Sequence, residues 1–78
     1  NYEKRAVNVR TSDVSNQLKI IADHGANILT IHQSIPINGT ASLSLSVQIL
    51  QTTQDVESML RRMEEQRGVH GVRLIAKE

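Results

Sequence analysis

Apolar and polar residues alternate strictly between positions 42 and 49 (SLSLSVQI), and this is the clearest pattern in the chain. A period of two puts the leucine, valine and isoleucine side chains on one face of a β-strand and the serine and glutamine side chains on the other. Upstream, residues 28–33 (ILTIHQ) are rich in β-branched side chains, and Asn38-Gly39 supplies the two positive-φ positions of a tight hairpin turn. Residues 25–49 therefore predict an antiparallel hairpin with one dry and one wet face.

Two segments have the 3.6-residue period of amphipathic helices. In residues 13–24 the apolar positions recur at i, i+4, i+7 and i+8, and they are Val14, Leu18, Ile21 and Ala22. Ser12 is the expected N-cap of this helix, and Gly25 is the expected left-handed residue after its last turn. Ile20 falls off the stripe and is expected at its border. The second helix is expected to end at Gly68, and its stripe is Val56, Met59, Leu60 and Met63.

Residues 3–10 and 72–76 are predicted to form one further strand each, which gives the order β-α-β-β-α-β. This is the ferredoxin-like arrangement of the α+β class, a four-stranded antiparallel sheet with two helices. Because crossover connections are right-handed, both helices are expected on the same face. The predicted core comprises Val7, Val9, Val14, Leu18, Ile21, Leu29, Ile31, Leu43, Leu45, Val47, Ile49, Val56, Met59, Leu60, Met63, Val72 and Leu74. The other face is expected to contact water and carries Thr30, His32, Ser42, Ser44, Ser46 and Arg73.

The chain has 78 residues, enough for a single domain over positions 1–78, and it has no cysteine for a disulfide or a thiolate metal site. Nine basic and eight acidic residues give a formal net charge of +1, which favours no polyanionic partner. No apolar run reaches the ~20 residues of a membrane span, and no signal peptide opens the chain, so we expect a cytoplasmic location and no membrane partner. Because the chain starts at Asn1 without a methionine, it is expected to be a fragment of a longer protein.

The residue types of the chain give little support for catalysis, metal binding or nucleic-acid binding. His24, His32 and His70 are predicted on a helix end, a strand and a loop, so no two of them share a site. No nucleophile–base pair or phosphate-cradling glycine loop is present, so we expect neither an enzyme active site nor a cofactor or metal. RNA-binding sheets of this topology stack bases on aromatic side chains, whereas Tyr2 is the only aromatic residue here. A binding or assembly module remains.

The turn from the first strand into the first helix is the best candidate for a ligand site. Backbone N–H groups that are unpaired at a helix N-terminus can hold the carboxylate of a small molecule. The residues of this turn are Arg10, Thr11, Ser12 and Asp13. The alternative, which the chemistry alone favours, is that these N–H groups meet only the helix caps and water.

The chain resembles an ACT domain, a small regulatory module of enzymes and regulators of amino-acid metabolism. All 78 residues fit the β-α-β-β-α-β order of that family. The most specific part is residues 25–47 (GANILTIHQSIPINGTASLSLSV). This stretch is similar to the small bacterial ACT proteins linked by name to phenylalanine biosynthesis (PheB-like proteins), in which a helical segment precedes one ACT domain. Residues 68–75 (GVHGVRLI) are similar to the last helix-to-strand passage of many ACT domains.

The resemblance implies that two copies pair side by side. ACT domains commonly associate through the edge strand after the first helix, which gives a continuous eight-stranded sheet, and amino acids bind at that interface. By position, the ligand site would combine the turn named above from one subunit with the start of the second strand, Asn27, Ile28 and Leu29, of its neighbour. An edge with excess apolar residues favours contact with a second copy, and the predicted edge comprises Ile28, Thr30, His32, Ile35 and Ile37. The alternative for the isoleucines is that they pack against their own helix.

One part of the chain departs from the family pattern. The ligand turn of ACT domains usually has an acidic residue and a glycine before the first helix, and these positions fall on Val9 and Ser12. A serine restricts φ and adds a side chain where a glycine would let the backbone approach the ligand. Three hypotheses therefore stand. The chain is a regulatory domain that dimerises and binds an amino acid, a dimerisation scaffold without a ligand, or the regulatory tail of a larger enzyme such as a dehydrogenase, a kinase or a stringent-response nucleotide synthetase.

Overall fold

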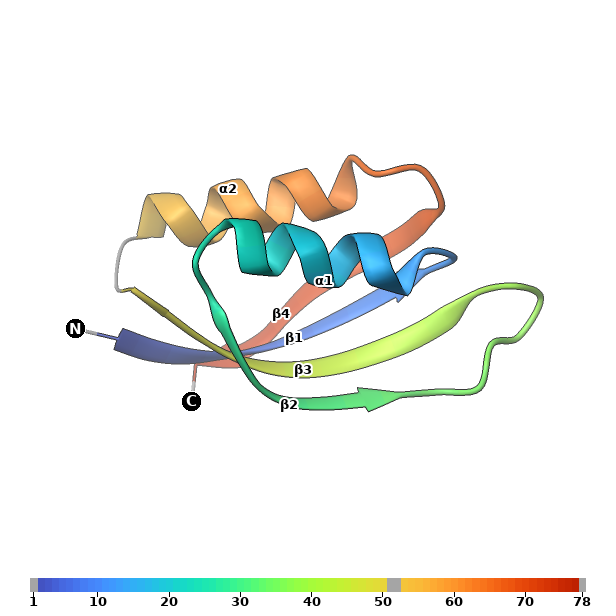
Figure 1. The fold of residues 1–78 in the computed structure, drawn as a ribbon, viewed down its shortest axis with the longest axis horizontal. Coiled ribbons are helices and arrows are strands. Elements are labelled where there is room, and N and C mark those ends of the chain that lie inside the picture. The colour runs from blue at the N-terminus through green and yellow to red at the C-terminus, as the bar shows by residue number, and fades with distance from the viewer. Residues whose placement is uncertain (1, 51–52, 78) are drawn as a thin grey trace.

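The computed structural model describes residues 2–50 and 53–77, which form one antiparallel sheet with both helices on the same face (Figure 1). In chain order the elements are β1 (Tyr2–Thr11), α1 (Val14–Asp23), β2 (Asn27–Gln33), β3 (Ala41–Leu50), α2 (Thr53–Glu64) and β4 (Val69–Lys77). The strands lie in the order β2-β3-β1-β4. The predicted ferredoxin-like fold is confirmed. The first and last strands in the sequence, β1 and β4, are both longer than predicted. β4 begins at Val69 because this residue pairs with Thr11 beyond a register shift.

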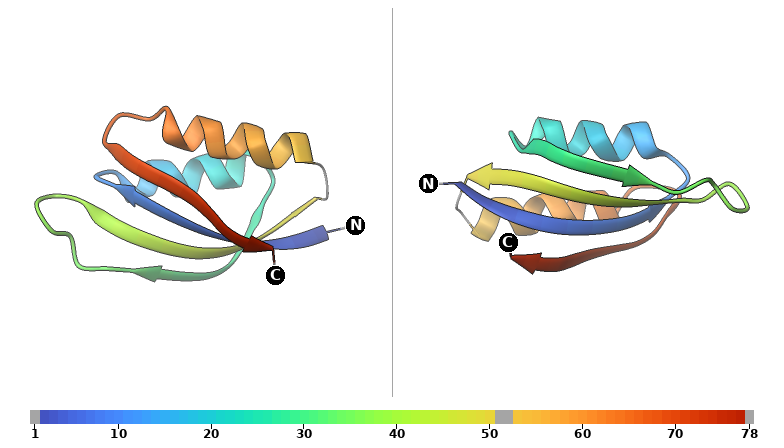
Figure 2. Two further views of the ribbon diagram at one scale, coloured as in Figure 1. Left: turned by 180° about the vertical axis from the view of Figure 1, so that it is seen from behind. Right: turned by 90° about the horizontal axis from the view of Figure 1, so that it is seen from below.

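The two central strands determine which side chains are buried. β1 pairs with β3 over its whole length, and the opposed residues Val9 and Leu43 both lie on the face turned toward the helices. The next pair along, Asn8 and Ser44, lies on the opposite face, where no helix covers the sheet (Figure 2, right). The alternation seen in residues 42–49 therefore separates a dry face from an open face, as predicted.

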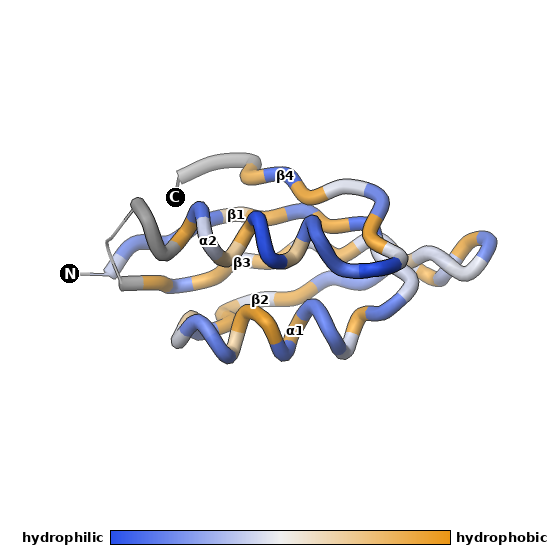
Figure 3. The backbone as a smooth tube through the Cα atoms, turned by 90° about the horizontal axis from the view of Figure 1, so that it is seen from above, coloured by the Kyte–Doolittle hydropathy of each residue, from blue (hydrophilic) through white to orange (hydrophobic). Residues whose placement is uncertain are grey.

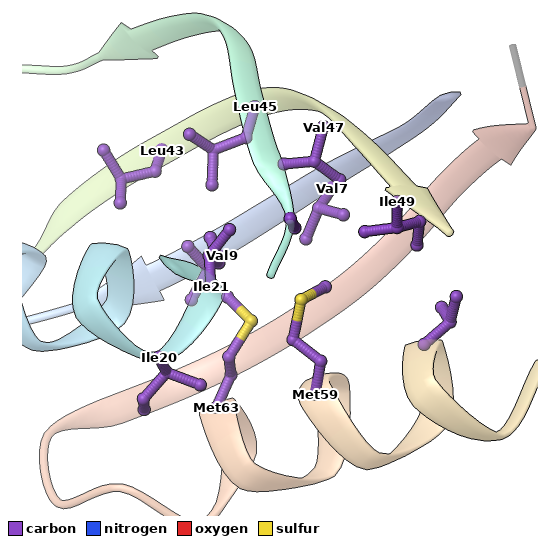
Figure 4. Packing of buried hydrophobic residues seen from close by; sticks show 12 residues of the cluster. Val7, Val9, Ile20, Ile21, Leu43, Leu45, Val47, Ile49, Met59 and Met63 are labelled. Atoms are coloured by element: carbon purple, nitrogen blue, oxygen red, sulfur yellow. The ribbon is translucent and has the colours of Figure 1, made fainter. Parts of the chain in front are cut away.

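The core lies between this sheet and the helices (Figure 4). Met59 and Met63 of α2 reach toward the sheet, and Ile21 of α1 is fully buried beside them. Each such aliphatic side chain contributes about 1.5–3 kcal/mol to folding. Of the predicted core, the fully packed members are Val7, Val9, Ile21, Leu43, Leu45, Val47, Ile49, Val56, Met59 and Met63, and the members partly buried against them are Val14, Leu18, Leu60 and Val72.

Three predicted core residues are in fact exposed. Leu29 is 44% exposed, and Ile31 and Leu74 are each 43% exposed. All three lie on β2 or β4, the two edges of the sheet, where each strand has a neighbour on one side only. The sequence pattern assigns a side chain to a face of the sheet but not to its middle or its edge. Burial on the edge strands was therefore overestimated.

The buried face of α1 differs from the predicted stripe. Ile20, expected at the border, is only 3% exposed, whereas Ala22, expected on the stripe, is exposed. Gln17 is fully buried as well, and its Nε2 donates to the carbonyl of Met63 on α2 at 3.3 Å. Its Oε1 has no partner among the described residues. Because α1 packs against α2 as well as the sheet, its buried face is shifted toward α2 and includes this polar residue.

The start of α1 is capped by Asp13 and not by Ser12. The Asp13 carboxylate accepts a hydrogen bond from the Asn16 N–H at 3.1 Å, and Val14 is the first helical residue. At the other end, Gly25 has a φ of +75° and its N–H donates to the Ala22 carbonyl, as expected of the residue after a helix. The cap prediction was wrong by one residue because several neighbouring side chains were chemically suitable.

Replacing Asp13 with alanine is expected to lower the free energy of unfolding by about 1 kcal/mol, because the Asn16 N–H loses its acceptor. The matched control is Ser12→Ala at the predicted cap, where the hydroxyl makes only a long contact of 3.5 Å with the Gly68 carbonyl. Urea denaturation followed by circular dichroism measures both. An equal loss of stability in the two variants would contradict the assignment of Asp13 as the cap.

The hairpin turn between β2 and β3 is the one that Asn38-Gly39 predicted. Asn38 and Gly39 have φ angles of +52° and +78°. The flanking residues Ile37 and Thr40 exchange backbone hydrogen bonds of 2.9 and 3.0 Å. Gln33 is the last residue of β2, so residues 34–40 extend beyond the sheet as a narrow tip (Figure 1).

Candidate ligand turn and pairing edge

The turn between β1 and α1 is closed by its own hydrogen bonds. The Ser12 N–H donates to the Gly68 carbonyl at 3.0 Å, and the Asp13 N–H donates to the Thr11 hydroxyl at 2.9 Å. The prediction that these backbone groups are unpaired is therefore wrong for Ser12 and Asp13. Sequence reasoning could not find the first of these bonds, because Gly68 lies in the turn between α2 and β4, 56 positions away in the sequence.

The N–H groups of Val14 and Ser15 remain available at the positive end of α1. The first N–H groups of a helix have no carbonyl in the preceding turn to receive them. Asn16 is already bonded to the Asp13 side chain, and the Gln17 N–H donates to the Asp13 carbonyl. Any anion held at this helix end would therefore meet Val14 and Ser15, just past the four predicted residues.

Arg10 and Thr11 project to opposite sides of the sheet. Thr11 is fully buried on the helix side. Arg10 is exposed and opposes Ser42, so it lies on the open face, away from the start of α1. The structure thus separates Arg10 from the other residues of the predicted ligand turn.

Ser12 contacts the turn that follows α2. Gly68 has a φ of +84°, and a Cβ atom built at this glycine would collide with the Ser12 hydroxyl oxygen. The serine side chain therefore occupies space that a residue other than glycine at position 68 would fill. Its hydroxyl is directed toward Gly68, whose carbonyl oxygen is 3.5 Å away.

Strand β2 is an edge strand with exposed aliphatic side chains. It pairs only with β3 among the described strands, and all seven of its residues are exposed. Ile28 and Ile31 oppose Val47 and Leu45, so they lie on the helix side of the sheet, where they are 37% and 43% exposed. Leu29 lies at a register shift between these two. Figure 3 shows apolar positions along this edge.

The predicted edge residues are all exposed but do not share one surface. Thr30 and His32 oppose Ser46 and Ser44 and lie on the open face. Ile35 and Ile37, in the tip beyond β2, are 85% and 74% exposed. The alternative that the isoleucines pack against their own helix is thus wrong for the two in the tip. Sequence reasoning missed Ile31 as an edge residue because its alternation with Thr30 and His32 made it look like core.

The two halves of the predicted ligand site lie at opposite ends of the sheet. Asn27, at the start of β2, is aligned through Gln48 of β3 with Lys4, near the beginning of β1. The ligand turn follows Thr11, at the other end of β1. Those two positions are seven residue steps apart along β1, a distance of about 23 Å. One copy of the chain therefore cannot bring both halves to a single small ligand.

Sequence comparison identifies relatives of this chain. It is 43% identical over 65 residues to a UPF0735 ACT domain-containing protein of Lachnoclostridium phytofermentans. The aligned region covers 83% of this chain and 44% of that protein, so the chain spans less than half the length of this relative. The chain belongs to the ACT-domain family. No family model matches the sequence.

Solved structures agree with this ACT domain in fold. The ACT domain from GTP pyrophosphokinase of Chlorobium tepidum superposes with a TM-score of 0.76 at 15% sequence identity, over 96% of this chain and 100% of that one. A homoserine dehydrogenase from Thiobacillus denitrificans superposes with a TM-score of 0.75 at 18% identity, over 96% of this chain but 17% of that one. These identities are too low to carry more than the fold.

The described residues of the ACT domain offer no metal centre. No group of three or more histidine, cysteine, aspartate or glutamate side chains is placed to hold an ion in residues 2–50 and 53–77. In the same part of the chain, neither helix has the length and apolar character needed to cross a membrane.

Proposed function

We propose that this ACT domain is a regulatory module that pairs with a second copy through β2 and binds a small amino acid at the shared edge. The observation that carries the proposal is the exposed aliphatic edge formed by Ile28, Leu29 and Ile31. Exposed edge strands invite pairing unless charge, proline or a cover protects them. Here Pro36 lies past the end of β2, and no charged residue lies within it.

Pairing of two β2 strands would complete the ligand site. In a twofold dimer the two edge strands run antiparallel, so the start of β2 in one copy lies beside the end of β2 in the other. The end of β2 is near the β1–α1 turn, because Gln33 opposes Leu43, which opposes Val9. Asn27–Leu29 of one copy would then approach the ligand turn of its partner. The separation of the two halves within one copy supports this arrangement.

The ligand carboxylate would interact with the N-terminus of α1. The Val14 and Ser15 N–H groups would donate to it, and the positive end of the helix favours a negative charge there. The side chain of Ser12 points toward Gly68, which leaves its backbone in place as one wall of the site. Ligand binding would favour one arrangement of the two copies, and this shift would reach the rest of the protein.

A calorimetric titration with the twenty amino acids tests ligand binding. We expect saturable heat from at least one of them, and a thermal transition that rises with its concentration, by about 2.7 kcal/mol of stability at a hundredfold excess over Kd. If the chain is dimeric and none of the twenty produces heat, the domain is a scaffold that joins subunits without a ligand. The bonds already made by the Ser12 and Asp13 N–H groups favour that second candidate.

A third candidate is the regulatory tail of a larger enzyme. The chain spans 44% of its relative from Lachnoclostridium phytofermentans, and its fold neighbours include domains from a GTP pyrophosphokinase and a homoserine dehydrogenase. Sequencing the reading frame upstream of Asn1 distinguishes the candidates. A catalytic domain there would support the enzyme tail, whereas a short helical segment would support a stand-alone regulator.

A further inference from the structure

The open face of the sheet carries positive charge and no acidic side chain among its described residues. Alternation along β1 and β4 puts Lys4, Arg10 and Arg73 on this face, opposed to Gln48, Ser42 and Asn8 respectively. The only acidic residue in the described strands, Glu3, opposes Ile49 on the helix side and is paired with Arg5. The right-hand view of Figure 2 looks onto the open face.

Arg10 and Arg73 lie close together on this face. Asn8 opposes Arg73, and Arg10 opposes Gly71, so the two arginines are diagonal neighbours on β1 and β4. Residues in that relation are about 7–8 Å apart and their Cβ atoms are somewhat closer, within reach for long side chains. Neither guanidinium has a hydrogen bond or ion pair to any residue in the described part of the chain, so the donors of both are available.

A hollow of about 390 Å³ lies between these arginines and β3. Gly71 leaves room in it, because a Cβ atom added at this position would touch nothing within 4 Å. Each polar residue that lines the hollow has a side chain that can donate a hydrogen bond, and these residues are Asn8, Arg10, Ser42, Ser44, His70 and Arg73. A site with two guanidiniums, two hydroxyls, an amide and an imidazole, and without a carboxylate, matches an oxyanion.

We propose that this hollow binds the phosphate group of a small metabolite. Arginine forks pair with phosphate oxygens through two parallel hydrogen bonds, and a phosphate has enough acceptor sites for both arginines and a hydroxyl. A nucleic acid strand is a poorer match, because no Phe, Tyr or Trp side chain lines the hollow to stack a base. Pairing through β2 leaves this site open, so the site does not depend on the function proposed above.

A titration of the ¹⁵N-labelled chain with inorganic phosphate, followed by NMR at constant ionic strength, tests the site. We expect saturable shifts of the Asn8, Ser44 and Gly71 amides. Acetate at the same ionic strength is expected to shift them much less. Shifts that never saturate would overturn the proposal, and equal saturation by acetate would identify a carboxylate site instead and overturn it as well.

Three variants separate a built site from general positive charge. Arg10→Gln and Arg73→Gln are each expected to raise the Kd for phosphate about tenfold, because each removes charge-assisted hydrogen bonds. Lys4→Gln is the matched control, since it removes one charge from the same face of β1 outside the hollow. An effect of Lys4→Gln equal to that of the arginine variants would mean unspecific attraction and would overturn the proposal.

Gly71→Val tests the hollow without a change of charge. Valine suits a β-strand, and the space around the added Cβ is open, so the fold is expected to be retained. The side chain would fill the room between the arginines and raise the Kd for phosphate about tenfold, a loss comparable to that of one arginine fork. Unchanged phosphate affinity in a variant with a native spectrum would overturn the assignment of the ligand to this hollow.

Discussion

Replacing Ile31 with lysine is expected to turn the proposed dimer into a monomer, with a rise of at least about a hundredfold in the dimer dissociation constant. Ile31 lies on the helix side of β2 and is 43% exposed. Pairing of two β2 edges would bury this side chain together with its twofold mate. Two lysines there would have to lose water without a partner and would repel each other, which costs several kcal/mol. Sedimentation equilibrium measures the change directly.

The matched control is Leu74→Lys on the other edge of the sheet. Leu74 is also 43% exposed, and it opposes Val7 on the helix side of β4. Both variants therefore place the same charge on the same face at equal exposure, and only the edge differs. The Leu74 variant is expected to dimerise like the original chain. If both variants dissociate equally, or if the original chain is monomeric at high concentration, pairing through β2 is wrong.

The same variant links pairing to ligand binding. The proposed site takes the N-terminus of α1 from one copy and Asn27–Leu29 from the other, so a monomer holds only half of it. The Ile31→Lys chain is therefore expected to lose the calorimetric signal of whichever amino acid binds the dimer. Binding that persists in the monomer with unchanged affinity would show a site within one copy.

Gly68→Ala is the second change with a large expected effect, a loss of about 2 kcal/mol in the free energy of unfolding. About half of this comes from the φ of +84°, which residues with a Cβ adopt at a cost of about 1 kcal/mol. The rest comes from Ser12, whose hydroxyl occupies the position of the new methyl group and has to rotate away from the Gly68 carbonyl. Urea denaturation gives the total.

Two further variants separate these contributions. Gly25→Ala has a similar φ of +75° but nothing within 4 Å of the added Cβ, so it should lose only about 1 kcal/mol. The double variant Gly68→Ala/Ser12→Gly should recover the part due to the collision, as a double-mutant cycle would detect. A Gly68→Ala loss no larger than that of Gly25→Ala would mean that the serine adapts at no cost.

The contact between Ser12 and Gly68 also bears on the departure of this chain from its family. Where the ligand turn of ACT domains usually has a glycine, this chain has Ser12, and the residue that it faces is a glycine instead. The side chain is thereby accommodated against the α2–β4 turn. Ser12 in place of the usual glycine is therefore compatible with the proposed ligand site, and the titration with amino acids tests whether a ligand binds there.

Local pattern was a reliable guide where a feature depends on neighbouring residues alone. The alternation of residues 42–49 predicted which side chains of β3 face the helices, and Asn38-Gly39 and Gly25 were found at the positive φ angles expected of them. The order of the six elements followed from the same periods. Each of these features is decided within a few residues of chain, so residue types and spacing were enough.

Features that depend on which elements lie side by side were decided only by the tertiary structure. Leu29, Ile31 and Leu74 are apolar residues of the kind found in cores, but they lie on the edge strands of the sheet. An edge strand has a neighbouring strand on one side only, so these side chains stay partly exposed. Ser12 meets Gly68 across 56 positions of sequence, a contact that closes the predicted ligand turn.

Thus the sequence by itself determined the fold, its order of elements and its family resemblance. The structure determined which apolar residues remain exposed at the edges, which backbone groups remain available at the ligand turn, and that both halves of the proposed amino-acid site cannot meet within one copy. The physical reason is that periodicity is a local property, whereas exposure and contact depend on distances between residues far apart in the chain.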